Sequence, residues 1–115
     1  MHLPEYPVYV ANFPVNMNKS IDGLCLTISG VLGKNPTETA LYVFFNKSRN
    51  RVKIFYWDFN GFCIWHKRLE KEKFKVPRST SDVFSLEPRQ LTWLLSGLDF
   101  TKLKGHQRLN YSDFF

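Results

Sequence analysis

Three apolar stretches separated by two polar turns constrain the fold more than any other feature of this 115-residue chain. They read ALYVFF from Ala40, RVKIFYW from Arg51 and FCIWHKRL from Phe62, with turns at residues 46–50 and 58–61. The stretches are rich in the β-branched and aromatic residues that favour strands, and the turns are rich in the polar residues and glycine of hairpin loops. Residues 40–76 therefore predict an antiparallel meander of three or four strands.

Side chains alternate between the two faces of such strands, and this alternation predicts which residues lie together. The middle strand carries Val52, Ile54 and Tyr56 on one face and Lys53, Phe55 and Trp57 on the other. In the next strand Phe62, Ile64, His66 and Arg68 face away from Cys63, Trp65, Lys67 and Leu69. Both faces carry large apolar groups, so we expect one face to pack on helices and the other to be partly wet.

The turn at residues 58–61, Asp-Phe-Asn-Gly, predicts a hairpin loop of three to four residues. Gly61 has no Cβ and can adopt a positive φ at little cost, so we expect it to take the left-handed position of this turn.

Two helices are predicted, one before the meander and one after it. The first has an apolar face of Ile21, Leu24, Ile28 and Leu32, with Asn16 and Asn18 as candidate caps and Gly33 as its stop. The second begins at Glu87-Pro88-Arg89-Gln90, a capping box with proline at the first helical position. Its apolar face is Leu91, Leu94, Leu95 and Leu98, and Gly97 is the expected left-handed terminator.

The remaining segments are short. We expect a strand at residues 7–12, a turn with a short edge piece at 70–77 and a flexible polar link at 78–82. The length fits one domain. The sequence therefore predicts a single α+β domain over residues 1–115, in which an antiparallel meander of about four strands packs against two main helices.

The excess positive charge is concentrated on the meander. Lys and Arg number 16 against 10 Asp and Glu, which gives a formal net charge of +6. Between Phe45 and Arg78 there are ten basic and three acidic residues, so this segment carries +7 and the rest of the chain −1. A basic segment of this kind indicates a polyanionic partner.

Two interpretations of the meander's surface stay open. Basic side chains that alternate with rings on a sheet can neutralise phosphates and stack on bases, as sheet-based binders of nucleic acid do. In the alternative, Lys53 and Lys67 form the solvent side of strands whose rings are core. The two are compatible if one sheet has a packed ring face and a basic outer face.

The sequence offers little support for catalysis. His2, His66 and His106 are scattered, and His66 lies beside Lys67 and Arg68, where an imidazole suits solvent or a phosphate better than general-base chemistry. The acids Asp22, Asp58, Glu70 and Asp99 are explained by a helix start, a turn or a helix end, and no P-loop, nucleophile elbow or zinc spacing appears. We expect no enzyme activity and no cofactor.

The cysteines and the hydropathy pattern bear on the compartment. Cys25 and Cys63 are too far apart for a C-x-x-C motif. This spacing favours the interpretation that both are small, buried hydrophobic residues of a protein in a reducing compartment. No apolar run reaches the roughly 18 residues of a membrane span, and the N-terminus lacks the pattern of a secretory signal. A cytoplasmic protein is expected.

Three strings in the chain resemble a known family. They are VYVANFPVNMNKSIDGL from Val8, LYVFFNKSRNRVKIFYWDFNGFCIWHKRLEKEKF from Leu41 and LTWLLSGLDF from Leu91. They are similar to the accessory protein encoded beside the transposase in IS-sixty-six insertion sequences, called TnpB or Orf2-like. The resemblance covers residues 8–100 and leaves 101–115 as a tail. Matched positions are Lys19, Ser20, Asp22, Gly23, Asn46, Arg51, Lys53, Trp57, Asp58, Asn60, Gly61, Phe62, Trp65, Lys67, Arg68, Leu69 and Glu70.

The resemblance implies a role in transposition beside a separate transposase, with element DNA and that transposase as partners. Three positions depart from the family pattern: Asn18 stands for a usual Arg, Phe59 for a common Gly and Cys63 for a common Trp. The loss of the arginine weakens a DNA contact at the start of the first helix and leaves the basic residues of the hairpins intact. The predicted nucleic-acid-binding residues are Lys47, Arg49, Arg51, Lys53, His66, Lys67 and Arg68.

Two functions remain as alternatives. The first is a non-catalytic transposition accessory factor that holds DNA, or a complex of transposase and DNA, through the basic hairpin face. The second is an adaptor that binds the transposase through exposed rings without touching DNA.

Overall fold

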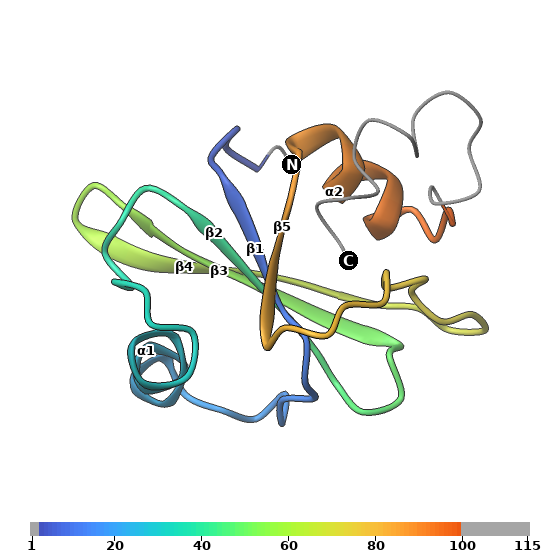
Figure 1. The fold of residues 1–115 in the computed structure, drawn as a ribbon, viewed down its shortest axis with the longest axis horizontal. Helices are drawn as coiled ribbons and strands as arrows, with labels where there is room; N and C mark the ends of the chain where they lie inside the picture. Colours follow the sequence, from blue (N-terminus) through green and yellow to red (C-terminus); the bar gives the residue numbers. More distant parts are fainter. Residues whose placement is uncertain (1–2, 100–115) are drawn as a thin grey trace.

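The computed structural model describes residues 3–99, which form one five-stranded sheet with a helix on each face (Figure 1). The elements in chain order are β1 (Val8–Ala11), α1 (Ile21–Gly30), β2 (Leu41–Phe45), β3 (Arg51–Asp58), β4 (Gly61–Arg68), β5 (Val83–Leu86) and α2 (Pro88–Leu95). The α+β class is confirmed, and the sheet has one strand more than the four expected.

The sheet order is β4-β3-β2-β1-β5, and its β2–β3–β4 part is the predicted meander. β1 pairs parallel to β2, so α1 is the crossover between two parallel strands. β5 pairs antiparallel to β1 and forms the second edge. The edge strand was expected within residues 70–77, and this was wrong, because that segment is irregular and the strand begins at Val83.

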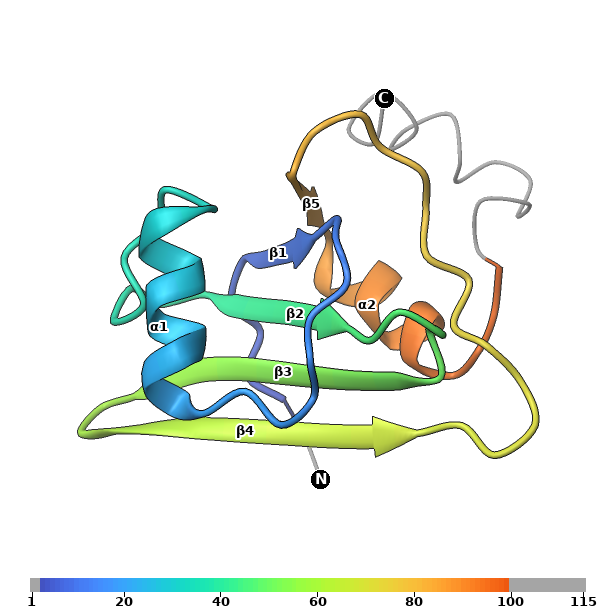
Figure 2. The ribbon, with the colours of Figure 1, turned by 90° about the horizontal axis from the view of Figure 1, so that it is seen from below.

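α1 covers one face of the sheet (Figure 2). Its Leu24 and Ile28 are completely buried in a cluster that includes Tyr42, Phe44 and Phe55 of β2 and β3. The predicted apolar face was too wide, because Ile21 is 42% exposed.

The start of α1 also differs from the prediction. Its N-cap is Ser20, whose Oγ accepts a hydrogen bond from the Gly23 N–H at 3.1 Å. Asn16 instead closes a turn before the helix, since its Oδ1 accepts from the Asn18 N–H at 2.8 Å.

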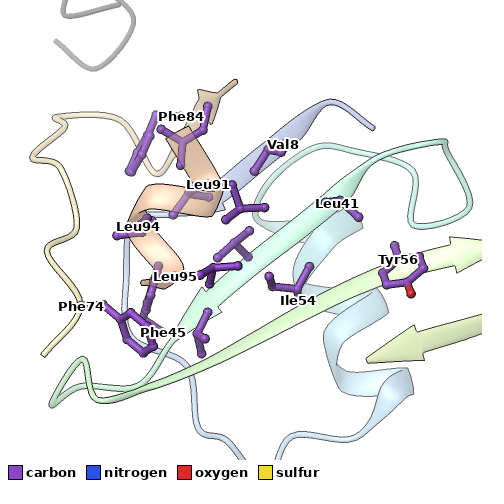
Figure 3. Close-up of a cluster of buried hydrophobic side chains, with 14 residues drawn as sticks. Val8, Leu41, Phe45, Ile54, Tyr56, Phe74, Phe84, Leu91, Leu94 and Leu95 are labelled. Atoms are coloured by element: carbon purple, nitrogen blue, oxygen red, sulfur yellow. The ribbon is translucent and has the colours of Figure 1, made fainter. Parts of the chain in front are cut away.

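α2 covers the opposite face (Figure 3). Leu91, Leu94 and Leu95 pack in a cluster with Val43 and Ile54. Helices therefore pack on both faces of the sheet, and the α1 face is also partly wet, as expected, because Ile64, His66 and Arg68 of β4 are exposed there. β3 carries large apolar groups on both faces because each face packs against one of the two core clusters.

The two ends of α2 follow the predicted signals. Gln90 Oε1 accepts from the Glu87 N–H at 2.8 Å. Gly97 adopts a φ of +84°, and the Gly97 and Leu98 N–H groups donate to Leu94 O and Trp93 O, which completes a left-handed helix terminus. Leu98 was expected in the apolar face but is 41% exposed.

The β3–β4 turn is tighter than predicted. Asp58 pairs with Gly61, so only Phe59 and Asn60 form the loop. The positive φ, 56°, belongs to Phe59 and not to Gly61, and the Asn60 N–H donates to Asp58 O across it. A positive φ at the first of two loop residues is the pattern of a type II′ hairpin turn, a position that favours glycine and strains a residue with a side chain.

Candidate nucleic-acid interface

The β3–β4 ladder brings four of the seven predicted nucleic-acid-binding residues onto one face. Arg51 pairs with Arg68, and Lys53 pairs with His66. Directly opposed residues of an antiparallel ladder point to the same side of the sheet. These four side chains form what we call the basic cluster, on the face that also carries α1.

The basic cluster is electrostatically unfavourable by itself. Two arginines lie directly opposite each other, and like charges in that position destabilise a sheet. Burial, followed by the charges of Lys53, Arg51 and Arg68, lowers the pKa of His66 below its ordinary 6.5. At neutral pH His66 is therefore an uncharged imidazole that can both donate and accept a hydrogen bond.

Two contacts attach the basic cluster to its surroundings. Lys53 Nζ donates to Lys19 O at 3.5 Å, so the start of α1 lies beside the cluster. Arg68 Nε donates to Glu70 Oε2 at 2.8 Å in an exposed ion pair. An exposed pair of this kind contributes about 1 kcal/mol or less, so Arg68 remains available to a stronger anion.

Lys47 and Arg49 lie in the exposed turn between β2 and β3. Asn46 shapes this turn, because its Oδ1 accepts from the N–H groups of Asn50 and Arg51 at 3.1 and 3.0 Å. The turn therefore presents cations next to the basic cluster while an amide side chain fixes its backbone.

A groove of about 380 Å³ separates this turn from the segment that precedes α1. Arg51 and Lys47 line it on one side, and Asn16 and Asn18 on the other. Arg51 thus belongs to both the groove and the basic cluster. The sequence did not reveal Lys19, Asn16 or Asn18 as neighbours of these cations, since the contacts join segments some thirty residues apart.

Lys67 lies apart from the other predicted residues. It pairs with Val52 and therefore points to the face that carries α2. Its Nζ donates to Leu95 O at 2.8 Å, at the carboxyl end of α2, where a cation is favoured by the exposed carbonyl groups. The sheet lies between Lys67 and the basic cluster.

Most rings of the hairpin are used in packing. Phe55 is completely buried and stacks on Phe62 with 4.8 Å between centroids, and Trp57 packs edge-on against the same ring at 4.8 Å. Phe59 differs, because its side chain at the hairpin tip is 90% exposed. The core interpretation of the rings therefore holds for the strands and leaves Phe59 unexplained by packing.

Residues 3–99 contain no group of three His, Cys, Asp or Glu side chains placed to hold a metal ion. Over the same residues no helix has the length and apolar character needed to cross a membrane. Cys25 and Cys63 are free and half-buried, and they pack beside opposite core clusters.

Comparison with known proteins decides the family. The family model described as IS66 Orf2 like protein matches residues 6–105. The chain belongs to the IS66 Orf2-like family. It is 32% identical over 93 residues to the uncharacterized protein y4hO of Sinorhizobium fredii, with 81% of each chain covered. It is 30% identical over 97 residues to the uncharacterized protein y4jC of the same organism, with 84% of this chain and 83% of that protein covered.

No solved structure matches this IS66 Orf2-like protein. Membership of the family implies a role in the transposition of IS66 elements. Several residues that match the family pattern have a local structural role in this fold. Ser20 caps α1, Asn46 shapes the β2–β3 turn, and Asp58 pairs with Gly61 at the β3–β4 turn.

Gly23, another matched position, leaves space for the side chain of Lys19. A Cβ at this position would lie 2.8 Å from Lys19 Cγ, so glycine makes room for the Lys19 stem and not for the sheet. This places the motif around Ser20 and Gly23 beside a cation that neighbours the basic cluster.

Proposed function

We propose that this IS66 Orf2-like protein is a non-catalytic accessory factor of transposition that binds DNA through the basic cluster and the neighbouring β2–β3 turn. The partner is the element's DNA, free or held by the transposase. Phosphate oxygens would be contacted by Arg51, Lys53 and Arg68, with Lys47 and Arg49 extending the contact along the turn.

The observation that carries this proposal is the opposition of Arg51 to Arg68 and of Lys53 to His66 in one ladder. Repulsion between opposed cations lowers the stability of the fold. These side chains add no compensating burial in the core, since they lie outside both core clusters. A bound polyanion would relieve this repulsion, because each phosphate neutralises one of the neighbouring cations.

Lys67 is excluded from this proposed contact. Its amine donates a hydrogen bond to Leu95 O at the end of α2, on the other face of the sheet. Substitution of Lys67 can therefore be compared with substitution of Arg68, a cation of the same strand that lies on the proposed DNA-binding face.

The test is a salt series of DNA affinity with element ends and with unrelated duplex. Each neutralised phosphate contributes about 0.9 to the magnitude of the slope of log affinity against log salt. Loss of one phosphate contact should therefore reduce that magnitude by about 1 in each of three single variants, Arg51→Ala, Lys53→Ala and Arg68→Ala. Arg89→Ala, which removes an exposed cation from α2, is the matched control and should leave affinity unchanged. Affinity that is indifferent to salt and to all three substitutions would refute the contact.

A second candidate function is supported by exposed apolar groups on α1 and at its C-cap, Val31. Leu26 is 72%, Val31 53% and Ile21 42% exposed. An adaptor that binds the transposase without DNA would use such a surface. A pull-down with purified transposase after nuclease treatment separates the two functions, since only the adaptor complex survives.

A further inference from the structure

β4 is an edge strand whose outer side is unpaired within residues 3–99. Its register against β3 runs without a bulge from Asp58–Gly61 to Arg51–Arg68, and the next bond, Leu69 N–H to Asn50 O at 2.8 Å, continues the ladder. Bonding groups alternate between the two sides of a strand. Because Leu69 bonds inward, the even-numbered residues Phe62, Ile64, His66 and Arg68 direct their N–H and C=O groups outward.

The two edges of the sheet differ in how they are protected. β5 has only four residues, and short edge strands are poor templates for pairing. β4 has eight residues with no proline, and its first five carry no charge. Ile64 is 37% exposed, and Phe62 and Trp65 are half-buried. A long, regular and partly apolar edge of this kind is open to another strand.

We propose that a second copy of this chain pairs antiparallel with β4 about a two-fold axis at Trp65. In this register Phe62 opposes Arg68 and Ile64 opposes His66 of the second copy, so all four outward-directed residues bond in both strands. Trp65 opposes itself, as an aromatic pair on the α2 face.

The charge pattern of β4 selects this arrangement. The uncharged residues lie in its first half, and His66, Lys67 and Arg68 lie in its second half. An antiparallel partner therefore places each basic residue opposite an apolar one, whereas a parallel partner in register would oppose the basic residues to themselves.

This pairing would join two sheets into one and place both basic clusters on the same face. With about 3.3 Å per residue and about 4.8 Å between strands, the two clusters would lie on the order of 15–20 Å apart. That distance exceeds a Debye length of about 10 Å at 0.1 M salt, so their mutual repulsion is small at moderate ionic strength. The dimer does not depend on DNA binding.

The first test is sedimentation of the purified protein without DNA over a range of concentrations, in about 1 M salt, where the Debye length is about 3 Å. We expect the mass to double as concentration rises. Ile64→Pro removes an outward N–H that β3 does not use and should remain a monomer, whereas Ile64→Val keeps the N–H and should still dimerise. A wild-type protein that is monomeric at every concentration, or a dimer that persists in Ile64→Pro, overturns the proposal.

A second test needs no substitution and so stands if Ile64→Pro fails to fold. The exchange of the Ile64 and His66 backbone N–H groups with solvent should slow as concentration rises, while that of Lys71, in the irregular segment after β4, should not change. Exchange of Ile64 and His66 that is independent of concentration overturns the pairing even if a dimer forms.

Discussion

Phe59 combines exposure and backbone strain in one residue. Its ring is 90% exposed, and its φ of 56° lies in the region where a side chain costs about 1–2 kcal/mol. Glycine carries no such cost, although it loses more entropy on folding. We therefore expect Phe59→Gly to raise the free energy of unfolding by up to about 1 kcal/mol in urea denaturation.

Phe59→Ala is the matched control for that prediction. Alanine removes the ring but keeps the Cβ that opposes a positive φ. If the strain lies in the backbone, Phe59→Ala gives no gain in stability. A larger gain for alanine than for glycine would show that removal of the exposed ring, and not relief of φ, controls the effect.

His66 makes the stability depend on pH in a defined direction. Its pKa is lowered in the folded protein, so the unfolded chain binds a proton first as the pH falls below about 6.5. The contribution of neutral His66 is fully present above that pH and is lost as the pH falls through the folded pKa. We expect the stability difference between wild type and His66→Gln to fall between about pH 7 and pH 5.

An NMR titration of His66 checks the same prediction directly. Without DNA its pKa should lie below 6.5. With duplex DNA bound, nearby phosphates should raise this pKa, because an anion favours the charged imidazole. A free-state pKa above 6.5 would contradict the arrangement of three cations around the ring.

At the scale of elements, strands and helices with local signals were predictable and their partners were not. β2, β3 and β4 followed from apolar runs and turns, and α2 from its capping box and Gly97. β5 was missed because its four residues, one of them a serine, lie between the polar link at 78–82 and the start of α2. The pairing of β1 with Leu41 to Val43 and with Val83 to Leu86 joins distant segments, which no local pattern reports.

The contact between β4 and α2 gives a prediction at this scale. Lys67→Met keeps an apolar stem of similar length and removes the hydrogen bond to Leu95 O. A bond from a charged group is worth about 1.5–3 kcal/mol, partly offset here by easier burial of the neutral side chain. We expect the free energy of unfolding to fall by about 1 kcal/mol, measured in urea.

DNA affinity distinguishes this structural role from a functional one. Lys67→Met should bind DNA as tightly as wild type under conditions where both are folded. A loss equal to that of Lys53→Ala would mean that DNA reaches both faces of β4.

At the scale of the whole molecule, the charge of the meander divides between two faces. The sequence predicted the +7 segment and, by alternation, that Lys67 faces away from His66 and Arg68. It did not predict that Lys19 adjoins Lys53, because that contact requires the path of the chain from β1 to α1. The candidate site therefore combines a local pattern with a nonlocal fold.

DNA bound on one face should protect lysines unequally, and acetylation of the complex measured by mass spectrometry tests this. Lys19, Lys47 and Lys53 lie at the basic cluster or its turn, so their acetylation should slow when duplex DNA is added. The control is Lys67, whose Nζ donates to Leu95 O on the opposite face of the sheet. Its reactivity should not change when DNA is added, and equal protection of all four lysines would contradict a one-sided contact.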